Sequence, residues 1–248
     1  MPKTPPRAFT VLARQPLTPH MLRLTLGGEA MRTFPADQSS AYIKLVLPGE
    51  GDTPARLRTY SVRQQREDAI DVDFVLHADG GPAANWARHA RPGDVIDVAG
   101  PGPVKRVAED ADWYLLVGDM TALPAIAANL ERLPPQAAGE VILEVISEAD
   151  IQPLAAPPDM RIRWLVQAHP GSDSAGLLEA VRELSWRPGK AGIWVACEFS
   201  AMRRLRRHLI DERGVDKRQM YLSSYWKYGA SEDGHRLSKR EDAEREGA

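Results

Sequence analysis

The chain changes its pattern at residues 113–123, WYLLVGDMTAL, where a continuous apolar run meets a Gly-Asp turn and then a helical pattern. An apolar run of this length that ends in a turn and a helix is typical of a buried strand in a parallel sheet. Downstream we expect apolar strands at 141–147, 162–167, 193–197 and 220–223, alternating with helices at 123–133, 175–184 and 200–213. This half of the chain therefore predicts an α/β nucleotide-binding domain with a parallel sheet.

The residues before this stretch follow a different pattern of short strands. We expect these strands at 10–12, 21–26, 42–47, 58–63, 69–76 and 95–99, with one helix over 82–90. Six short strands separated by Gly-Pro turns predict a small barrel or a sandwich. We therefore expect one domain at 1–109 and a second at 110–229. The charged tail at 230–248 lacks apolar periodicity and is expected to be mobile unless the active site orders part of it.

Composition excludes several classes of protein. The 248 residues carry a formal net charge of -2, which argues against a nucleic-acid partner. Cys197 is the only cysteine, so it is expected to be a buried structural thiol in a reducing cytoplasm. No apolar run approaches the ~18 residues of a membrane span, and no histidines pair as metal ligands. We expect a cytoplasmic monomer without a membrane partner or a protein-bound metal.

Arg58-Thr59-Tyr60-Ser61 carries most of the functional prediction. On a strand, Arg58 and Tyr60 share one face, while Thr59 and Ser61 share the other. A flavin dinucleotide needs a cation for its pyrophosphate, a flat aromatic surface for its ring and polar groups at the ring edge. This run supplies all three. The alternative is an ordinary exposed strand, because four-residue patterns recur by chance.

A glycine-rich helix start follows this motif, with the sequence DGGPAANW at 79–86. Glycines allow a ligand to approach the backbone closely, and a helix N-terminus presents N–H groups to an anion. A Gly-Pro turn at 100–103 follows. These segments would converge on one dinucleotide. The candidate residues are His77, Asp79, Gly81, Pro82, Ala83 and Ala84.

The turn after the strand at 113–117 is the second candidate nucleotide site. Gly118 would allow the turn, Thr121 can cap the helix, and the helix start can hold a nucleotide phosphate. No Gly-x-Gly-x-x-Gly is present, so the alternative is a plain strand-to-helix turn. The candidate residues are Gly118, Asp119, Thr121 and Ala122.

Together these segments resemble the siderophore-interacting protein family over about residues 11–232. The terminal run Tyr225-Trp226-Lys227-Tyr228-Gly229, which on its own fits a core plug, completes the match. The resemblance implies a ferredoxin-reductase-like fold, with an antiparallel six-stranded FAD-binding β-barrel before an NAD(P)H-binding α/β domain. It also implies that Trp226 or Tyr228 covers the flavin, and that Glu198, at the end of the strand at 193–197, lies near the nicotinamide. Relatives often carry Ser or Thr at the position of Ala84, so this chain would rely on backbone N–H groups there.

The resemblance also implies a positive pocket for anionic ferric siderophores. It assigns Lys44 and Lys227 to this pocket, whereas Lys105 is a guess, because relatives often carry Arg at the position of Gly102. For each lysine the alternative is a solvated surface charge. The run 203–207, RRLRR, is expected to be a solvated helix face.

The implied function is an FAD-dependent, NAD(P)H-dependent ferric-siderophore reductase that releases Fe²⁺. A ferredoxin is a second candidate donor. The alternatives are a general NAD(P)H:flavin or ferredoxin-linked reductase, and a siderophore-binding carrier with a structural flavin. Because Glu148 and Asp150 would repel a ribose 2′-phosphate, we expect NADH to be preferred, unless Arg161 or Arg163 accommodates NADPH.

Overall fold

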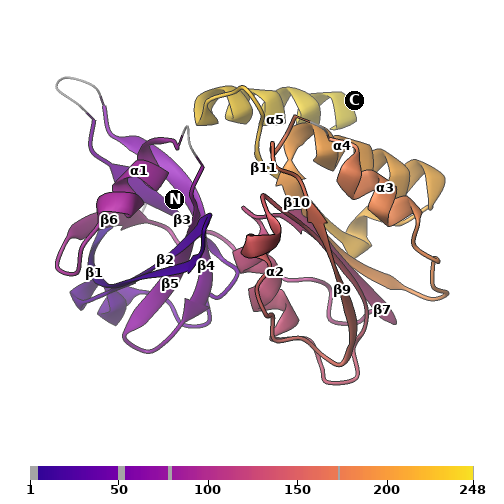
Figure 1. Ribbon diagram of the computed structural model, residues 1–248, viewed down its shortest axis with the longest axis horizontal. Helices are drawn as coiled ribbons and strands as arrows, with labels where there is room; N and C mark the ends of the chain where they lie inside the picture. Colours follow the sequence, from indigo (N-terminus) through magenta and orange to yellow (C-terminus); the bar gives the residue numbers. More distant parts are fainter. Residues whose placement is uncertain (1–4, 50–53, 78–79, 173, 248) are drawn as a thin grey trace.

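The chain forms a β-barrel followed by an α/β domain, as the sequence predicted (Figure 1). The computed structural model describes residues 5–49, 54–77, 80–172 and 174–247. The closed barrel has the order β1-β2-β5-β4-β3-β6, and every pairing is antiparallel. Its elements are β1 (Arg7–Thr18), β2 (Met21–Gly27), η1 (Glu29–Thr33), β3 (Tyr42–Leu47), β4 (Arg56–Gln65), β5 (Ala69–Val75), α1 (Pro82–His89) and β6 (Val95–Ala99).

Alternating side chains fill the barrel. In β3, Ile43, Leu45 and Leu47 are buried, whereas the residues between them are only partly covered. This period of two places one face of each strand inside the barrel. The helix α1 adds Ala83, Ala87 and Ala90 to the same core.

The second domain is a five-stranded sheet with the order β11-β10-β7-β8-β9, and all its pairings are parallel. Its elements are β7 (Trp113–Asp119), α2 (Leu123–Leu130), β8 (Ala138–Val145), η2 (Glu148–Asp150), β9 (Asp159–Val166), α3 (Gly176–Arg182), β10 (Ala191–Glu198), α4 (Phe199–Arg207), η3 (His208–Glu212), η4 (Lys217–Gln219), β11 (Met220–Trp226) and α5 (Glu232–Gly247). The described part of the chain contains no helix long and apolar enough to cross a bilayer.

Helices cover both faces of this sheet. The helix α2 packs on the face toward the barrel, while α3 and α4 pack on the other face. Gly118 lies inside β7 and permits the close approach of α2. A Cβ on Gly118 would lie 2.8 Å from Ala122 Cβ and 2.8 Å from the Ala196 carbonyl oxygen. The glycine is therefore required by packing and not by the turn that the sequence suggested.

Buried polar groups join the two domains at the linker between them, which includes Lys105 and Val107. Asn129 of α2 donates from Nδ2 to Ser40 Oγ and to the Lys105 carbonyl, both at 3.1 Å, and accepts from the Val107 N–H at 2.8 Å. The same Lys105 carbonyl accepts from Trp194 Nε1 at 3.0 Å and from Ser40 Oγ at 2.6 Å. These bonds fix the linker between a barrel residue, a helix and a strand of the sheet.

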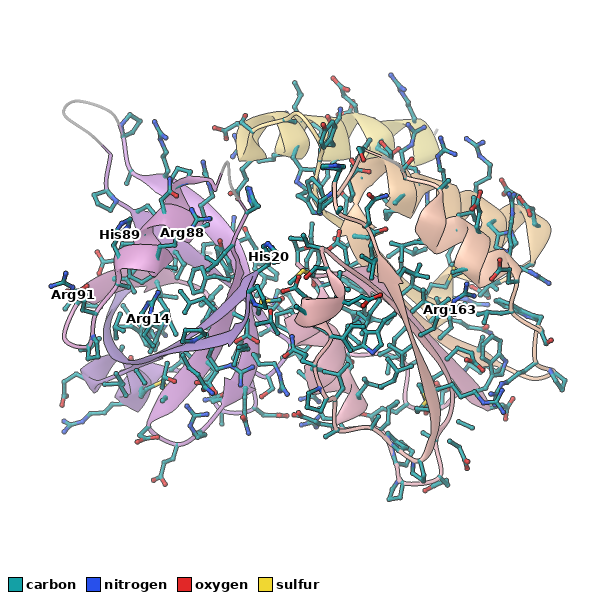
Figure 2. The ribbon with its side chains drawn as sticks, in the orientation of Figure 1. Arg14, His20, Arg88, His89, Arg91 and Arg163 are labelled. Atoms are coloured by element: carbon teal, nitrogen blue, oxygen red, sulfur yellow. The ribbon has the colours of Figure 1, made fainter. Side chains whose placement is uncertain are left out.

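A second contact between the domains centres on Asp150, whose carboxylate is fully buried. It accepts from Thr18 Oγ1 at 2.8 Å and from the His20 backbone N–H at 2.9 Å, and it meets His20 Nδ1 at 2.8 Å. Within its own domain it also accepts from the Ser147 N–H and Oγ. His20 stands on the side of the barrel that faces the parallel sheet (Figure 2). Burial alone would raise the pKa of Asp150, but these hydrogen bonds outweigh it and lower that pKa.

Asp150→Ala should lower the free energy of unfolding by roughly 2–5 kcal/mol, because it removes a buried, hydrogen-bonded charge at an interface. The folded-state pKa lies below the ordinary value of 3.8, so this stabilisation is present above pH 3.8 and is lost as the pH falls through the lower folded value. Urea unfolding at pH 7 and at pH 3 measures both effects. Glu148→Ala, an exposed carboxylate in the same turn, is the matched control. Equal stability of the two variants at pH 7 would contradict this assignment.

Candidate functional site

The strand β4 carries the Arg58–Ser61 motif, and Tyr60 of this motif packs against the barrel core. Tyr60 packs on Phe74 with ring centroids 4.4 Å apart, and Phe74 lies 6.1 Å from Trp86 of α1. Burial raises the pKa of Tyr60. This row of rings connects the motif on β4 with the glycine-rich helix start, as two parts of one binding site require.

The start of α1 is open to a ligand. Gly81 is the N-cap, and no heavy atom of the described residues lies within 4 Å of a Cβ added there. Pro82 occupies the first turn, and Ala83 and Ala84 are buried. Their N–H groups belong to the first turn, where helix donors lack partners within the helix. His77 is exposed, and the predicted contact of Asp79 lies outside the described residues.

The terminal strand β11 meets the flavin motif through Tyr225. Burial raises the pKa of Tyr225, and its hydrogen bond to Ser61 partly offsets that rise. Its ring lies 6.3 Å from Trp194, and the Tyr221 ring lies 5.2 Å from the same indole. The prediction missed Tyr225, although strand alternation places Tyr221, Ser223 and Tyr225 on one face.

Trp226 and Tyr228, expected at the flavin, lie at the carboxyl edge of the parallel sheet. Trp226 donates from Nε1 to Asp119 Oδ2 at 2.8 Å. The Tyr228 N–H donates to Glu198 Oε1 at 3.1 Å, and the Tyr228 side chain is 60% exposed. The predicted nucleotide residues Asp119 and Glu198 therefore contact this aromatic segment.

Thr121 does not cap α2, in contrast to the prediction. The N-cap is the buried Ala122, which makes no side-chain cap bond. Thr121 donates its N–H and its hydroxyl to Asp119 Oδ1 instead, at 2.9 and 2.5 Å. Glu198 is the residue that caps a helix, because it accepts from the N–H groups of Ser200 and Ala201 at the start of α4.

The C-terminal tail forms the helix α5, whereas the prediction was a tail that is mobile unless the active site orders part of it. The helix begins on the barrel side and runs over the sheet toward α4 (Figure 1). At its start, Glu232 pairs with Arg58 at 3.4 Å and accepts from Thr59 Oγ1 at 3.4 Å. Toward its end, Asp242 pairs with Arg203 and Arg206 at 2.9 and 2.8 Å. Those two arginines were expected on a solvated face, and they instead bind α5.

Each of the predicted substrate lysines interacts with a residue of this helix. Lys44 of β3 lies opposite Thr59 of β4. Burial raises the pKa of Glu232, and the positive charge of Lys44 partly offsets that rise. Lys105 Nζ lies 5.5 Å from the Tyr221 ring centre. Lys227 donates to Ser238 Oγ at 2.8 Å and lies over the Phe199 ring, so its ammonium faces α5.

Lys239 of α5 is a basic residue at this site that the prediction missed. It donates to the Ser224 carbonyl at 3.0 Å and to Ser223 Oγ at 3.2 Å. Burial and then Lys105 lower its pKa, so Lys105 and Lys239 share one electropositive region. The sequence signal was absent because the tail has no apolar pattern that predicts docking.

The expected preference for NADH rested on two carboxylates, and only one of them is accessible. Asp150 is buried between the domains and binds Thr18 and His20, so it is not available to a ribose. Glu148 is exposed. Arg163 pairs with Glu183 at 2.6 Å.

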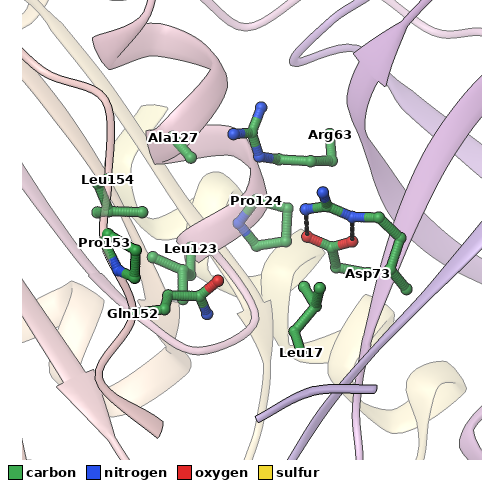
Figure 3. Close-up of a pocket in the computed structure, with 10 residues that line it drawn as sticks. Leu17, Arg63, Asp73, Leu123, Pro124, Ala127, Gln152, Pro153 and Leu154 are labelled. Atoms are coloured by element: carbon green, nitrogen blue, oxygen red, sulfur yellow. Dashed lines mark hydrogen bonds and ion pairs between the residues drawn. The ribbon is translucent and has the colours of Figure 1, made fainter. Parts of the chain in front are cut away.

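A polar cavity of about 120 Å³ lies between the domains near the start of α2 (Figure 3). Both of its arginines are paired: Arg23 makes a bidentate bond to Asp73, and Arg63 bonds to Glu131. None of the predicted site residues lines it. Among the described side chains, no group of three His, Cys, Asp or Glu could hold a metal ion. Cys197 is fully buried, and burial raises its pKa well above the ordinary value.

Comparison with known proteins agrees with this geometry over nearly the whole chain. The family model for the siderophore-interacting FAD-binding domain matches residues 10–57 and 50–105, and the model for the siderophore-interacting protein matches residues 111–229. The ferric vibriobactin reductase ViuB of Vibrio cholerae is 32% identical over 93% of this chain and 92% of its own length. The chain belongs to the siderophore-interacting protein family.

A solved structure of the family has the same architecture. The siderophore-interacting protein SipS from Aeromonas hydrophila is 31% identical, covers 97% of this chain and 98% of its own, and has a TM-score of 0.87. The ferredoxin-NADP+ reductase of Plasmodium falciparum, 13% identical with a TM-score of 0.68 over 89% of this chain and 96% of its own, shares the fold. The ferredoxin-reductase-like fold that the sequence predicted is thus confirmed.

The residues of this family member fit an FAD. The open N-cap at Gly81 leaves space against the first N–H groups of α1, which suits a pyrophosphate. Arg58 is only partly buried, and its nearest acidic partner is the single carboxylate of Glu232. Ser61 and Tyr225 supply hydroxyl groups where the domains meet.

The docking of α5 should weaken in acid. His235 is buried, its Nε2 lies 2.8 Å from Ser224 Oγ, and burial lowers its pKa from 6.5 to about 4. Because the folded-state pKa of His235 is lowered, docking is fully stabilised above pH 6.5, and this contribution is lost as the pH falls toward 4. Hydrogen exchange of residues 232–247 at pH 7 and pH 5 measures it, with His235→Gln as the variant that lacks the pH response. Equal protection of the wild-type helix at both pH values would rule this out.

Proposed function

We propose that this chain is an FAD-dependent reductase of ferric siderophores that takes electrons from NADH or NADPH. The observation that carries the proposal is the meeting of the Arg58–Ser61 strand of the barrel with the terminal aromatic strand, through Ser61 and Tyr225. This contact brings the proposed FAD site of the barrel next to the parallel sheet of the second domain. Such an arrangement suits electron transfer between a pyridine nucleotide and the flavin. ViuB, a ferric vibriobactin reductase, supports the choice of substrate.

Each part of the chain has a defined task in this proposal. FAD, when bound, accepts a hydride and gives up electrons one at a time. Arg58 and the N–H groups of Ala83 and Ala84 hold the pyrophosphate, while Tyr60 presents a flat face to the ring. Ser61 and Tyr225 orient the ring edge by hydrogen bonding. The residues Gly118, Asp119, Thr121, Ala122 and Glu198 form the proposed pyridine-nucleotide side of the site.

The basic residues near α5 attract the substrate. Lys44 interacts with Glu232 at the start of that helix, and Lys105 interacts with Lys239 in its middle, so Lys239 joins the set. Many ferric siderophores are anionic, so a positive surface raises their local concentration. Oxygen donors favour Fe³⁺, so Fe²⁺ is released after reduction. Lys227 is the least suited of the predicted lysines, because Ser238 and Phe199 already engage its ammonium.

We further propose that the chain acts in the cytoplasm as a monomer, with the domain boundary at residues 109–110. Anaerobic titration of the purified, FAD-loaded protein with NADH, NADPH and a reduced ferredoxin identifies the donor. Adding a ferric siderophore to the chemically reduced protein then tests the second half-reaction. Flavin reoxidation with Fe²⁺ formation supports a reductase. Tight siderophore binding without electron transfer contradicts it and favours a carrier.

Arg58→Ala should weaken FAD binding by roughly 2–4 kcal/mol, because it removes the cation proposed for the pyrophosphate. Equilibrium titration of the apoprotein with FAD, followed by flavin fluorescence, measures the loss. Arg56→Ala is the matched control, since Arg56 is an exposed arginine on the same strand. Full FAD affinity of the Arg58 variant would overturn this assignment.

Lys44→Ala should raise the KM for an anionic ferric chelate about three- to tenfold and flatten its salt dependence. The physical reason is the loss of one charge from the proposed substrate region. Steady-state kinetics at several salt concentrations measure both quantities. Lys217→Ala is the control, because Lys217 is exposed and lies just before the amino end of β11. An unchanged salt slope for the Lys44 variant would return that lysine to the solvated surface.

A further inference from the structure

The proposed reaction leaves a proton that the protein has to dispose of. A hydride carries one proton and two electrons, whereas two ferric ions together take only the two electrons. Each turnover therefore leaves one proton on N5 of the flavin, and this proton has to reach solvent. Ser61, the hydroxyl proposed at the ring edge, is itself only 9% exposed. A proton that arrives at Ser61 therefore needs further groups to carry it to the surface.

Hydroxyl groups continue from Ser61 along one face of β11. Tyr225 is hydrogen-bonded to Ser61 and to Tyr221, and Tyr221 is hydrogen-bonded in turn to Ser223. Strand alternation places the three residues of β11 on the same face. A hydroxyl group both donates and accepts hydrogen bonds, and its hydrogen rotates freely. Four hydroxyl groups in series can therefore pass a proton along while their oxygen atoms stay in place.

The indole of Trp194 fixes the two tyrosine rings of this series. Its ring centre lies 5.2 Å from that of Tyr221 and 6.3 Å from that of Tyr225. Its own N–H donates to the Lys105 carbonyl at 3.0 Å, so the indole does not compete for the tyrosine hydroxyl groups. Trp194 is fully buried in the sheet. The two rings packed on it are therefore held at positions that keep their hydroxyl groups together.

The series ends at Lys239 of α5. Lys239 Nζ donates to Ser223 Oγ at 3.2 Å and to the Ser224 carbonyl at 3.0 Å, and the residue reaches solvent. The protein atoms around the ammonium group, and then the charge of Lys105, lower the pKa of Lys239. An amine with a lowered pKa gives up its proton more readily. Lys239 is thus suited to accept a proton from Ser223 and to release it to water.

We infer that a proton exit path leads from the flavin to Lys239 through the hydroxyl groups of Ser61, Tyr225, Tyr221 and Ser223. The inference deepens the proposed function and rests on its oxidant, a ferric chelate. As two electrons pass one at a time to two Fe³⁺ ions, the N5–H bond breaks, its electron pair stays on N5, and its proton goes to Ser61 Oγ. Each hydroxyl group accepts a proton on its oxygen and gives its own to the next. One proton enters at Ser61 and one leaves Lys239 for water.

The groups around the path keep both tyrosines protonated at neutral pH. Burial raises the pKa of Tyr225, and the neighbouring charge of Asp119 adds to that rise. Burial also raises the pKa of Tyr221, with a smaller contribution from Tyr42. Lys105 Nζ lies 5.5 Å from the centre of the Tyr221 ring. Each tyrosine therefore has a hydroxyl proton to pass on, and neither becomes a trapped phenolate.

The test follows the N5 proton without turnover. FAD labelled with ¹⁵N at N5 is loaded into the protein and reduced with dithionite, and NMR measures how fast the N5–H proton exchanges with water. We expect Tyr225→Phe, which keeps the ring and removes the hydroxyl group, to slow this exchange at least about tenfold. Tyr42→Phe is the matched control, because Tyr42 lies near Tyr221 but its hydroxyl group is outside the path.

An equal exchange rate in the wild type and in Tyr225→Phe would overturn the inference, because water would then reach N5 by another route. If Tyr225→Phe binds FAD poorly, Tyr221→Phe decides instead. Its missing hydroxyl group is one step further along the path, so the bond between Tyr225 and Ser61 is kept.

A second measurement separates this inference from the proposed function. The reduced protein is mixed with a ferric chelate in H₂O and in D₂O, and flavin reoxidation is followed by absorbance. We expect Tyr221→Phe to reoxidise more slowly and with a larger solvent isotope effect than the wild type, and Tyr42→Phe to match the wild type. Equal isotope effects in all three proteins would contradict the path. If the wild type passes no electrons to a ferric chelate, the proposed function fails, while the N5–H exchange still decides whether the path exists.

Discussion

The Lys105 carbonyl is the point on which the geometry of the site depends. It accepts hydrogen bonds from Ser40 of the barrel, Asn129 of α2 and Trp194 of β10, so three parts of the chain converge on one linker atom. Asn129 is itself buried and bonded at both ends of its amide. Leaving any of these buried groups unpaired costs about 1–3 kcal/mol. The linker therefore positions the flavin strand β4 against the terminal strand β11 with little freedom.

This anchoring explains why residues from opposite ends of the chain meet at the candidate site. Ser61 on β4 and Tyr225 on β11 are far apart in sequence, and their hydrogen bond joins two domains that the linker and the Asp150 contact hold together. The helix α5 then reaches from β11 back to the barrel, where Glu232 meets Arg58 and Thr59. Its contacts are mostly polar, and Leu237 is 56% exposed. A helix held in this way depends on charge and protonation more than on burial.

The sequence predicted the elements whose pattern is local and missed those decided by tertiary contacts. β3 and β6 match their expected bounds, because period-two alternation between turns is a local signal. Thr121 was expected to cap α2, but the carboxylate of Asp119 competes for its hydroxyl. Asp150 was expected near a ribose, and a partner some 130 residues earlier, His20, buries it instead. The helix α5 was missed because ion pairs, and not an apolar stripe, dock it.

Two buried carboxylates hold different parts of this fold together. Asp150 binds Thr18 and His20 of the barrel and Ser147 of its own domain, so no single donor can leave without straining the interface. Asp119 binds Thr121 locally, and its remaining side-chain donor is the indole of Trp226. The indole thereby ties the end of β11 to the end of β7, across β10. The first carboxylate therefore joins the two domains, and the second joins the terminal aromatic segment to the sheet.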